Sequence, residues 1–392
     1  MNQDATEKGL SRRNFTKAAA VGAAGLTVGL SMSSPGAEAE KTTEAPKAET
    51  QGGAKIPSRD LGKTGLKVSE ISLGAMDVRD AAVVSKAIDA GCTYIDTAAG
   101  YDEGQNEVMV GTIMAKRRKE VVLATKFAPS SKNEIFASVD RSLKSLQTDV
   151  IDVIQVHNMR DGQAVRNPEF KDAFDVMKKQ GKVRFLGFTT HGNQVEVINA
   201  CIELGYVDAM LIGLSASDPP AVADAVERAR KAGIGTVIMK SMKGARTFKN
   251  TGSKLTPHQM AARWVLDKPY VDTVNIGMVS FAHVDEDVKA SQLALSALDR
   301  INLERYAAAA CTTCSMCGAC AKCPNGVEPL EILRAHMYAF SYGNIEKARE
   351  EFLAMGGPAM LRACGDCGQC EEKCPRRIKV REQFRQVAGL LA

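Results

Sequence analysis

The stretch VVLATKFAPSSKNEIFASVDRSLKSLQTDVIDVIQV, residues 121–156, contains the unit that decides the fold. It begins and ends with short apolar runs rich in Val and Ile, at 121–125 and 150–156, and such runs predict β-strands. Between them, residues 133–146 repeat apolar side chains three and four positions apart, which is the spacing of an amphipathic helix. A strand, a helix and a second strand in this order predict a parallel βαβ unit.

The same alternation continues on both sides, from about residue 56 to residue 300. Strands are expected at 70–73, 93–96, 121–125, 150–156, 183–188, 209–214, 235–239 and 273–276, and helices at 80–90, 133–146, 170–179, 194–204, 219–232, 257–266 and 283–291. Eight such units in roughly 245 residues predict an α/β protein with a (β/α)8 TIM barrel, which usually needs about 250 residues. A doubly wound open sheet is the alternative, but no G-x-G-x-x-G follows the first strand. Before the barrel, Gly62 and Gly65 indicate a small hairpin that closes its bottom.

The composition excludes some classes of partner. The 392 residues carry a net charge of +5 from 51 basic and 46 acidic side chains, and no basic patch is interleaved with aromatics, so nucleic acid is not expected to bind. The longest apolar run, residues 18–30, is too short for a typical membrane span. A small-molecule site in a globular protein is the natural expectation.

The N-terminus has the features of an export signal. Arg12 and Arg13 precede a weakly apolar stretch, and Ala37-Glu38-Ala39 follows as a small-x-small cleavage site. This order resembles a twin-arginine (Tat) signal over residues 1–39, which predicts passage through the Tat translocase to the periplasm or another extracytoplasmic space. Residues 40–55 are polar with Ala, Gly and Pro and read as a linker.

Polar side chains follow three neighbouring strands at their C-terminal ends, where barrel enzymes carry their active sites. Asp96 ends the second strand and Tyr101 follows it, while Lys126 ends the third and His157 follows the fourth. A tyrosine can protonate a carbonyl oxygen if a nearby lysine lowers its pKa from about 10. An aspartate can hold that lysine, and a histidine can polarise the carbonyl. Each residue alone could be a cap, a solvated side chain or a core side chain, but together at one rim they predict an active site.

Residues 57–290 resemble the aldo-keto reductase family, which implies an oxidoreductase. The resemblance is carried by SRDLGKTGLKVS (58–69), IDTAAGY (95–101), LATK (123–126), IQVHN (154–158) and LGFTTHG (186–192). In that family the Asp, Tyr, Lys and His of these motifs form a catalytic tetrad. The resemblance therefore implies that Tyr101 is the general acid and that the other three members are Asp96, Lys126 and His157.

The resemblance also implies a nicotinamide dinucleotide, NAD(P)H, extended across the rim of the barrel. Lys240, or alternatively Met239, stands where many members place a ring against the nicotinamide. No Lys or Arg follows the eighth strand before Lys289, so the sequence does not predict NADPH over NADH or over the absence of a dinucleotide. The implied cofactor-binding positions are Asn158, Thr189, Thr190, Lys240 and Gly277.

The C-terminal part, residues 301–392, contains nine of the 11 cysteines. The segment CGDCGQCEEKCP, residues 364–375, has the C-x2-C-x2-C-x3-C-P spacing of bacterial ferredoxins with [4Fe–4S] clusters. Zinc ribbons use separated C-x2-C pairs, so this triplet argues against zinc. The isolated Cys92 and Cys201 lie in apolar helical contexts and are expected in the core.

The segment CTTCSMCGACAKCP, residues 311–324, supplies the partner set with five cysteines. Its last gap is one residue shorter than in ferredoxins, a variant that resembles aldo-keto reductases with a C-terminal ferredoxin module. In two-cluster ferredoxins the Cys-Pro cysteine ligates the other cluster. One cluster would then take Cys314, Cys317, Cys320 and Cys374, and the other Cys323, Cys364, Cys367 and Cys370. Cys311 is left over as a buried residue, unless the frame shifts so that Cys311 serves and Cys320 or Cys323 is spare.

Two functions are consistent with these patterns. The first is an exported iron–sulfur oxidoreductase that reduces a small-molecule carbonyl, or oxidises an alcohol, and exchanges electrons with a redox partner protein through two [4Fe–4S] clusters. The second is an electron-transfer protein whose barrel is a scaffold without dinucleotide-dependent catalysis. The tetrad favours the first, and the departures at the dinucleotide positions favour the second.

Overall fold

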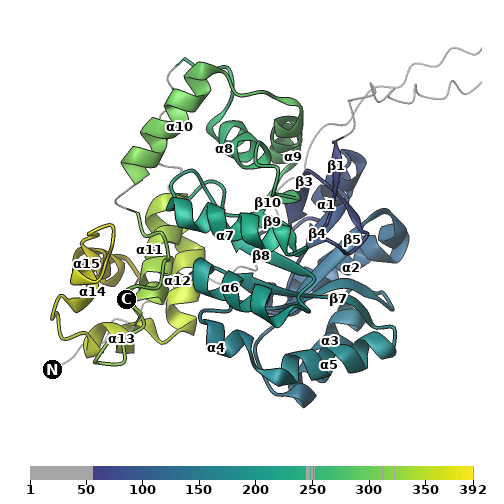
Figure 1. Ribbon diagram of the computed structural model, residues 1–392, viewed down its shortest axis with the longest axis horizontal. Coiled ribbons are helices and arrows are strands. Elements are labelled where there is room, and N and C mark those ends of the chain that lie inside the picture. Colours follow the sequence, from purple (N-terminus) through teal and green to yellow (C-terminus); the bar gives the residue numbers. More distant parts are fainter. Residues whose placement is uncertain are drawn as a thin grey trace, which may run out of the picture. The chain divides into compact units, whose positions relative to one another are not determined.

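A computed structural model describes residues 56–243, 248, 250, 252–310, 313–321 and 323–391, which belong to one compact unit. Its centre is a closed parallel barrel of eight strands, ordered β10-β3-β4-β5-β6-β7-β8-β9 and surrounded by helices (Figure 1). The predicted TIM barrel is therefore confirmed. The strands are β3 (Ile71–Gly74), β4 (Tyr94–Asp96), β5 (Val122–Phe127), β6 (Ile151–Val156), β7 (Val183–Thr190), β8 (Ala209–Gly213), β9 (Gly235–Met239) and β10 (Thr273–Ile276).

All seven predicted barrel helices are present with small changes at their ends. They are α1 (Ala81–Asp89), α3 (Lys132–Ser145), α5 (Pro168–Lys179), α6 (Gln194–Leu204), α7 (Pro220–Lys231), α8 (Pro257–Leu266) and α9 (Phe281–Asp287), the last continued by the 3₁₀ turn η4 (Val288–Gln292). The sequence patterns did not predict α2 (Gln105–Arg117), α4 (Gly162–Val165) or α10 (Ala297–Ala309). Helix α10 crosses residue 300, the expected end of the barrel segment.

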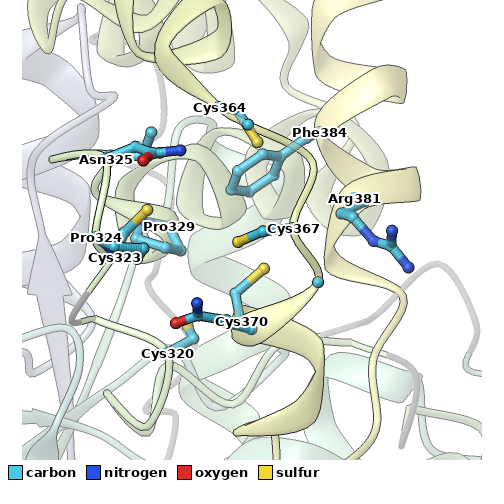
Figure 2. Close-up of a pocket in the computed structure, with 14 residues that line it drawn as sticks. Cys320, Cys323, Pro324, Asn325, Pro329, Cys364, Cys367, Cys370, Arg381 and Phe384 are labelled. Carbon is cyan, nitrogen blue, oxygen red and sulfur yellow. The ribbon is translucent and has the colours of Figure 1, made fainter.

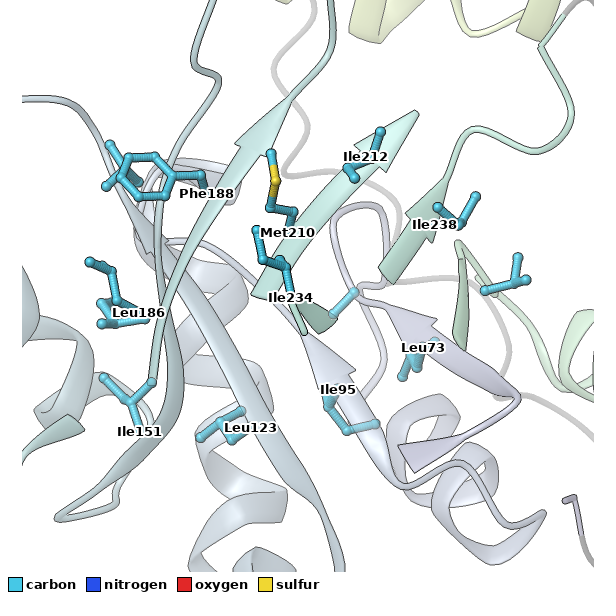
Figure 3. Packing of buried hydrophobic residues seen from close by; sticks show 14 of the residues in the cluster. Leu73, Ile95, Leu123, Ile151, Leu186, Phe188, Met210, Ile212, Ile234 and Ile238 are labelled. Carbon is cyan, nitrogen blue, oxygen red and sulfur yellow. The ribbon is translucent and has the colours of Figure 1, made fainter. Parts of the chain in front are cut away.

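Side chains alternate between the two faces of the barrel wall, because successive residues of a strand point to opposite sides. Ile95 and Leu123 point outward and pack with the helices in the main core, which Figure 3 shows around the labelled strand residues. Tyr94, Val122 and Ala124 belong to a separate apolar cluster inside the barrel. At the C-terminal ends of β4 and β5, the same alternation points the last inward-facing side chains toward the rim of the barrel.

The predicted hairpin closes the other end of the barrel. Its strands β1 (Ser58–Asp60) and β2 (Lys67–Ser69) pair antiparallel. Gly62 adopts a φ of +53°, and a Cβ at this position would lie 2.3 Å from the Gly235 nitrogen. Only glycine allows this approach, so the hairpin seals the bottom of the barrel and leaves the C-terminal rim for a site.

The C-terminal module, residues 313–391, has its own apolar core, which includes Phe352, Phe384 and Val387. Its helices are α11 (Pro329–His336), which continues as the π-helical turn η6 (Met337–Tyr342), then α12 (Ile345–Ala354), α13 (Gly357–Ala363), α14 (Gln369–Glu372) and α15 (Val380–Leu391). None of the helices among the described residues is long and apolar enough to cross a membrane. The predicted export signal and linker, residues 1–55, and Cys311 lie outside the described residues.

The module packs against the C-terminal rim of the barrel. The Asn193 backbone N–H donates to the Met316 carbonyl at 2.6 Å, and Arg376 donates to the Ser217 carbonyl at 2.8 Å. Arg160 forms an ion pair with Glu328 at 2.7 Å. These contacts hold the module over the ends of β6, β7 and β8, so the rim is shaped by both parts of the chain.

Candidate active site

A buried ion pair lies at the C-terminal end of β4 and β5. The Lys126 Nζ lies 2.5 Å from an Asp96 carboxylate oxygen, and the exposed fractions of the two side chains are 1% and 3%. Lys126 also donates to the Thr97 carbonyl at 2.6 Å, and the Gln155 amide donates to the other Asp96 oxygen at 2.9 Å. Since both charges are paired and hydrogen-bonded, this desolvated pair can persist inside the barrel.

Tyr101 lies directly above this pair. It begins the 3₁₀ turn η1 (Tyr101–Gly104), where Asp102 and Glu103 take left-handed φ values of 51° and 52° before α2 starts. The Lys126 Nζ is 4.7 Å from the centroid of the Tyr101 ring. The loop after β4 therefore brings the predicted tyrosine and lysine together, as the strand-end pattern indicated.

Burial outweighs the expected effect of Lys126 on the acidity of Tyr101. Burial raises the pKa of Tyr101 well above its ordinary value, and the negative charges of Asp96 and Asp77 raise it further. Lys126 gives its hydrogen bonds to Asp96 and to the Thr97 carbonyl rather than to the phenol. Tyr101 is consequently a neutral phenol that can donate a proton but does not lose it readily to water.

His157 completes the predicted set. Its ring lies edge-on to the Tyr101 ring, with centroids 5.9 Å apart. Burial lowers the pKa of His157 to about 3, and the charge of Lys126 contributes to this shift. The imidazole is therefore neutral near pH 7, so one ring nitrogen can donate and the other can accept.

The strand-end pattern did not single out His191, although this residue lies inside the quoted LGFTTHG motif. Its ring centroid is 6.3 Å from that of His157, and its Nδ1 is buried without a hydrogen-bond partner among the described residues. Burial lowers the pKa of His191 well below its ordinary value. A second neutral imidazole therefore stands beside the predicted one.

These groups face a cavity of about 480 Å³. The barrel contributes Tyr101, His157 and His191, and the C-terminal module contributes Arg334, Tyr338 and Glu351. The remaining wall combines apolar residues with the polar Asn158, Arg160 and Asp161; the apolar ones are Met76, Ala128, Pro129, Met159 and Ala164. A cavity of this size with a few converging polar groups is typical of small-molecule sites.

The predicted dinucleotide positions are mostly occupied by contacts within the chain. The Thr189 hydroxyl accepts from the Asn158 backbone N–H at 2.7 Å, and the Thr190 hydroxyl donates to the Gly192 carbonyl at 2.5 Å. The Lys240 ammonium donates to the Tyr338 hydroxyl at 3.2 Å. Of the five positions, Asn158 lines the cavity. Gly277 is exposed, and no atom lies within 4 Å of the place where a Cβ would stand. These residues fit poorly as a cradle for a dinucleotide.

One predicted cysteine set surrounds a small enclosed space in the C-terminal module. Cys323, Cys364, Cys367 and Cys370 all line it, with Cys320 at one side and Phe384 at the other (Figure 2). The four thiols are not in disulfides. Gly368 has a φ of +79° at the start of α14, so the turn between Cys367 and Cys370 needs a glycine.

The cysteines of the other predicted set influence one another's pKa, and Cys320 is also influenced by Cys370 of the first set. Burial raises the pKa of Cys314 to about 12, and the charges of Cys317 and Cys374 lie close enough to raise it further. Cys320 is affected in the same way by Cys314 and Cys317. Among the described residues no three His, Cys, Asp or Glu side chains converge closely enough for a single metal ion. The cysteines Cys323, Cys364, Cys367 and Cys370 line one small space, and thiolates are the ligands of [4Fe–4S] clusters. Cys92 and Cys201 are fully buried in the barrel core, as expected.

Comparison with known proteins agrees with the barrel geometry. Residues 70–253 match the model of the aldo/keto reductase family. An uncharacterized oxidoreductase of Bacillus subtilis is 34% identical over 150 residues, which is 34% of this chain and 48% of that protein. L-galactose dehydrogenase of Arabidopsis thaliana is 26% identical over 283 residues, covering 60% of this chain and 88% of that protein. The matches to the first curated relatives span less than half of their length.

Solved structures share the barrel fold. An aldo-keto reductase from Bacillus halodurans superposes with a TM-score of 0.55 at 24% identity, covering 64% of this chain and 96% of that one. An aldo-keto reductase from Klebsiella pneumoniae, solved in complex with NADPH, has a TM-score of 0.55 at 22% identity and covers 62% of this chain and 93% of that one. At these identities the likeness shows the fold alone.

Proposed function

We propose, since the barrel of this chain belongs to the aldo/keto reductase family, that the protein is an oxidoreductase that reduces a carbonyl or, in reverse, oxidises an alcohol. The observation that carries the proposal is the cavity into which Tyr101 and His157 project above the buried Lys126–Asp96 pair. All four members of the predicted tetrad lie at one rim. The C-terminal module, which carries the predicted cluster cysteines, contributes Arg334, Tyr338 and Glu351 to the same cavity.

The chain's own groups support the proton chemistry. The neutral Tyr101 phenol donates its proton to the carbonyl oxygen, and the neutral His157 imidazole can donate a hydrogen bond to the same oxygen. The Lys126 cation beneath the Tyr101 ring offsets the negative charge that develops when the phenol gives up its proton. Residues of both parts of the chain line the site, and the Lys126–Asp96 pair beneath it is buried, which strengthens its electrostatic effect.

Two [4Fe–4S] clusters are part of the proposal and supply single electrons when bound. Cys323, Cys364, Cys367 and Cys370 fit one cluster because they line one enclosed space. The second would be held by Cys314, Cys317, Cys320 and Cys374. Protein purified without oxygen should contain about eight irons and eight acid-labile sulfides per chain. A content near zero or a single zinc ion would reject the clusters. Because Thr189, Thr190 and Lys240 are engaged within the chain, the two electrons of the proposed reaction, R₂C=O + 2e⁻ + 2H⁺ → R₂CHOH, would come from the clusters, with one proton from Tyr101 and the other from solvent.

The acid role of Tyr101 is tested by Tyr101→Phe, with Tyr94→Phe as a matched control. The Tyr94 hydroxyl is buried inside the barrel and has no hydrogen-bond partner in the part of the chain that the structure describes, so its removal should not affect catalysis. With 2,3-butanedione as the probe carbonyl and reduced methyl viologen or NADPH as the electron donor, Tyr101→Phe should lower kcat by about 10²- to 10⁴-fold. If the wild-type protein forms no acetoin with either donor, the proposed activity is wrong; if Tyr101→Phe is as active as wild type, the acid assignment is wrong.

The second candidate is an electron-transfer protein whose barrel is only a scaffold. The occupied dinucleotide positions favour it, since Lys240 and the two threonine hydroxyls are engaged within the chain. It predicts that the clusters exchange electrons with a redox partner protein while ligands of the barrel cavity have no effect. The Tyr101→Phe comparison separates the two candidates.

We also propose export through the Tat translocase to the periplasm or another extracytoplasmic space. The support is the Arg12-Arg13 pair, the weakly apolar stretch after it and the small-x-small site at residues 37–39. This route suits a protein that must receive its clusters before export. Replacing both arginines by lysine should leave the unprocessed precursor in the cytoplasm, and unchanged processing would reject the signal.

A further inference from the structure

A second tyrosine–lysine pair faces the cavity from the C-terminal module. The Lys240 Nζ lies 4.6 Å from the centroid of the Tyr338 ring and 3.2 Å from its hydroxyl oxygen. This arrangement parallels the first pair, in which the Lys126 Nζ is 4.7 Å from the Tyr101 ring. Both tyrosines line the same cavity.

The two pairs come from well-separated parts of the barrel rim. Tyr101 follows β4, whereas Lys240 follows β9, and two strands, β3 and β10, lie between them in the barrel order. Tyr338 lies on η6 and reaches the rim only because the module docks there. A ligand in the cavity can therefore meet a phenol on two sides.

Lys240 is held in an unusual state. Its backbone takes a left-handed φ of 57°, and it forms no ion pair with a carboxylate among the described residues. Burial lowers the pKa of Lys240 to about 7, and the positive charges of Arg334 and Lys243 contribute. The contact it makes is the hydrogen bond to Tyr338, so its evident role is to hold that hydroxyl in place.

Two properties of the proposed site restrict the class of substrate: its clusters would donate electrons one at a time, and its cavity presents two phenols. A hydride donor supplies one of the two hydrogens of a carbonyl reduction, so one proton donor suffices. Iron–sulfur clusters supply electrons only, so both hydrogens must arrive as protons. Their potentials do not fall below about −700 mV, and an isolated carbonyl is a poor acceptor of a single electron. A conjugated ring with two carbonyl oxygens accepts two separate electrons and takes one proton on each oxygen.

We propose that the substrate is a quinone, which Tyr101 and Tyr338 reduce together by protonating one oxygen each. The proposal rests on the function proposed above and names its substrate class. The reaction is Q + 2e⁻ + 2H⁺ → QH₂. The two [4Fe–4S] clusters, when bound, would supply the two electrons; the Tyr101 and Tyr338 phenols give the two protons, and solvent protons restore the phenols through the cavity opening. A low-potential one-electron donor protein reduces the clusters again.

The cavity walls suit such a ring. Met76, Pro129 and Met159 supply apolar surface to the wall of the cavity that both tyrosines line. Arg160 and Arg334 line the cavity but are paired with carboxylates of the module, Arg160 with Glu328 and Glu331 and Arg334 with Glu331 and Glu351. The neutral imidazoles and phenols are hydrogen-bonding groups that suit an uncharged ligand, and the Arg334 Nε, buried without a hydrogen-bond partner among the described residues, can donate one more hydrogen bond. A volume of about 480 Å³ accommodates a one- or two-ring quinone.

The test compares Tyr338→Phe with Tyr342→Phe, using menadione as the probe. Tyr342 lies on the same π-helical turn, its ring is 6.1 Å from that of Tyr338, and its buried hydroxyl has no partner among the described residues. Fully reduced, desalted protein is mixed with menadione without oxygen, and cluster reoxidation is followed by absorbance. Wild type and Tyr342→Phe should form one menadiol per chain, and Tyr338→Phe should be slower by about 10²- to 10⁴-fold.

Further readouts separate this proposal from the proposed function. Equilibrium dialysis against oxidised protein should show menadione binding that Tyr338→Phe weakens by about 2- to 10-fold, the loss of one hydrogen bond. Lys240→Met should slow reoxidation, and Lys240→Arg should restore most of the rate. If Tyr101→Phe slows reoxidation but Tyr338→Phe does not, the quinone assignment is rejected and the proposed carbonyl reductase activity is retained. If neither variant slows it, both fall.

Discussion

Removing one partner of the buried Lys126–Asp96 pair should destabilise the barrel strongly. In Lys126→Met the Asp96 carboxylate remains buried and keeps only the hydrogen bond from Gln155. Breaking a buried ion pair in this way costs about 3–5 kcal/mol. For a domain of this size, each kcal/mol lowers Tm by roughly 2–4 °C, so we expect a fall of roughly 6–20 °C.

The barrel offers a matched control in a second buried pair. The Lys243 Nζ lies 2.5 Å from Asp218, and the exposed fractions of these side chains are 1% and 0%. In Lys243→Met, Asp218 keeps two hydrogen bonds from Ser215, from its backbone N–H at 2.8 Å and its hydroxyl at 2.9 Å. The loss of stability should therefore be smaller. Lys243 does not line the cavity, so activity should stay near that of wild type, whereas Lys126→Met should be nearly inactive.

Thermal unfolding followed by circular dichroism measures the stability of both variants, and acetoin formation measures their activity. The double variant Asp96→Asn/Lys126→Met should recover part of the lost Tm, because it leaves no unpaired charge. A fall of less than about 2 °C in Lys126→Met would refute the buried ion pair. Equal loss of activity in Lys126→Met and Lys243→Met would show that activity depends on barrel packing rather than on the group beneath Tyr101.

Two further predictions concern the histidine and the cysteines. The pKa of His157 is lowered to about 3 in the folded protein but is near 6.5 in the unfolded chain. Between these pH values the unfolded state therefore binds one more proton than the folded state. As a result, the free energy of unfolding should fall by up to about 1.4 kcal/mol for each pH unit below pH 6.5. His157→Gln lacks this contribution, so its Tm should fall less than that of wild type between pH 7 and pH 4; parallel Tm curves would contradict the buried neutral imidazole. Cys370→Ala should lose about four of eight irons, while the buried core variant Cys92→Ala should lose none. An unchanged iron content in Cys370→Ala would remove that cysteine from the ligand set.

The barrel could be predicted because its signals are local. Each strand is a short Val- and Ile-rich run and most helices have an apolar face, so the order of the units follows from the sequence alone. Helix α2 gave no such signal, since its apolar pattern is weak and Gly111 interrupts it. The structure supplies the reason for this glycine: a Cβ there would lie 2.1 Å from the Ser145 carbonyl oxygen at the end of α3. A glycine that disfavours the helix locally is required by packing between helices.

The residues of the candidate site also divide into those that the sequence could predict and those that it could not. Asp96, Lys126 and His157 could be placed together because parallel strands of a barrel end at one rim. Tyr338, Arg334 and Glu351 could not, since they belong to helices far along the chain and only the docking of the module brings them to the cavity. The raised pKa of Tyr101 could not be predicted from the sequence pattern either, because the effect of burial on this pKa outweighs that of the neighbouring lysine.

The docking contact itself connects the proposed clusters with the cavity. Met316 lies between Cys314 and Cys317, and its carbonyl accepts from the Asn193 backbone N–H at 2.6 Å. A Cβ on Gly192 would lie 2.8 Å from the same carbonyl, so a larger residue would push the module away from the rim. Gly192 directly follows His191, which lines the cavity. The glycine of the LGFTTHG motif therefore has a physical purpose in this chain: it lets the loop that carries Cys314 and Cys317 pack against the barrel rim beside His191.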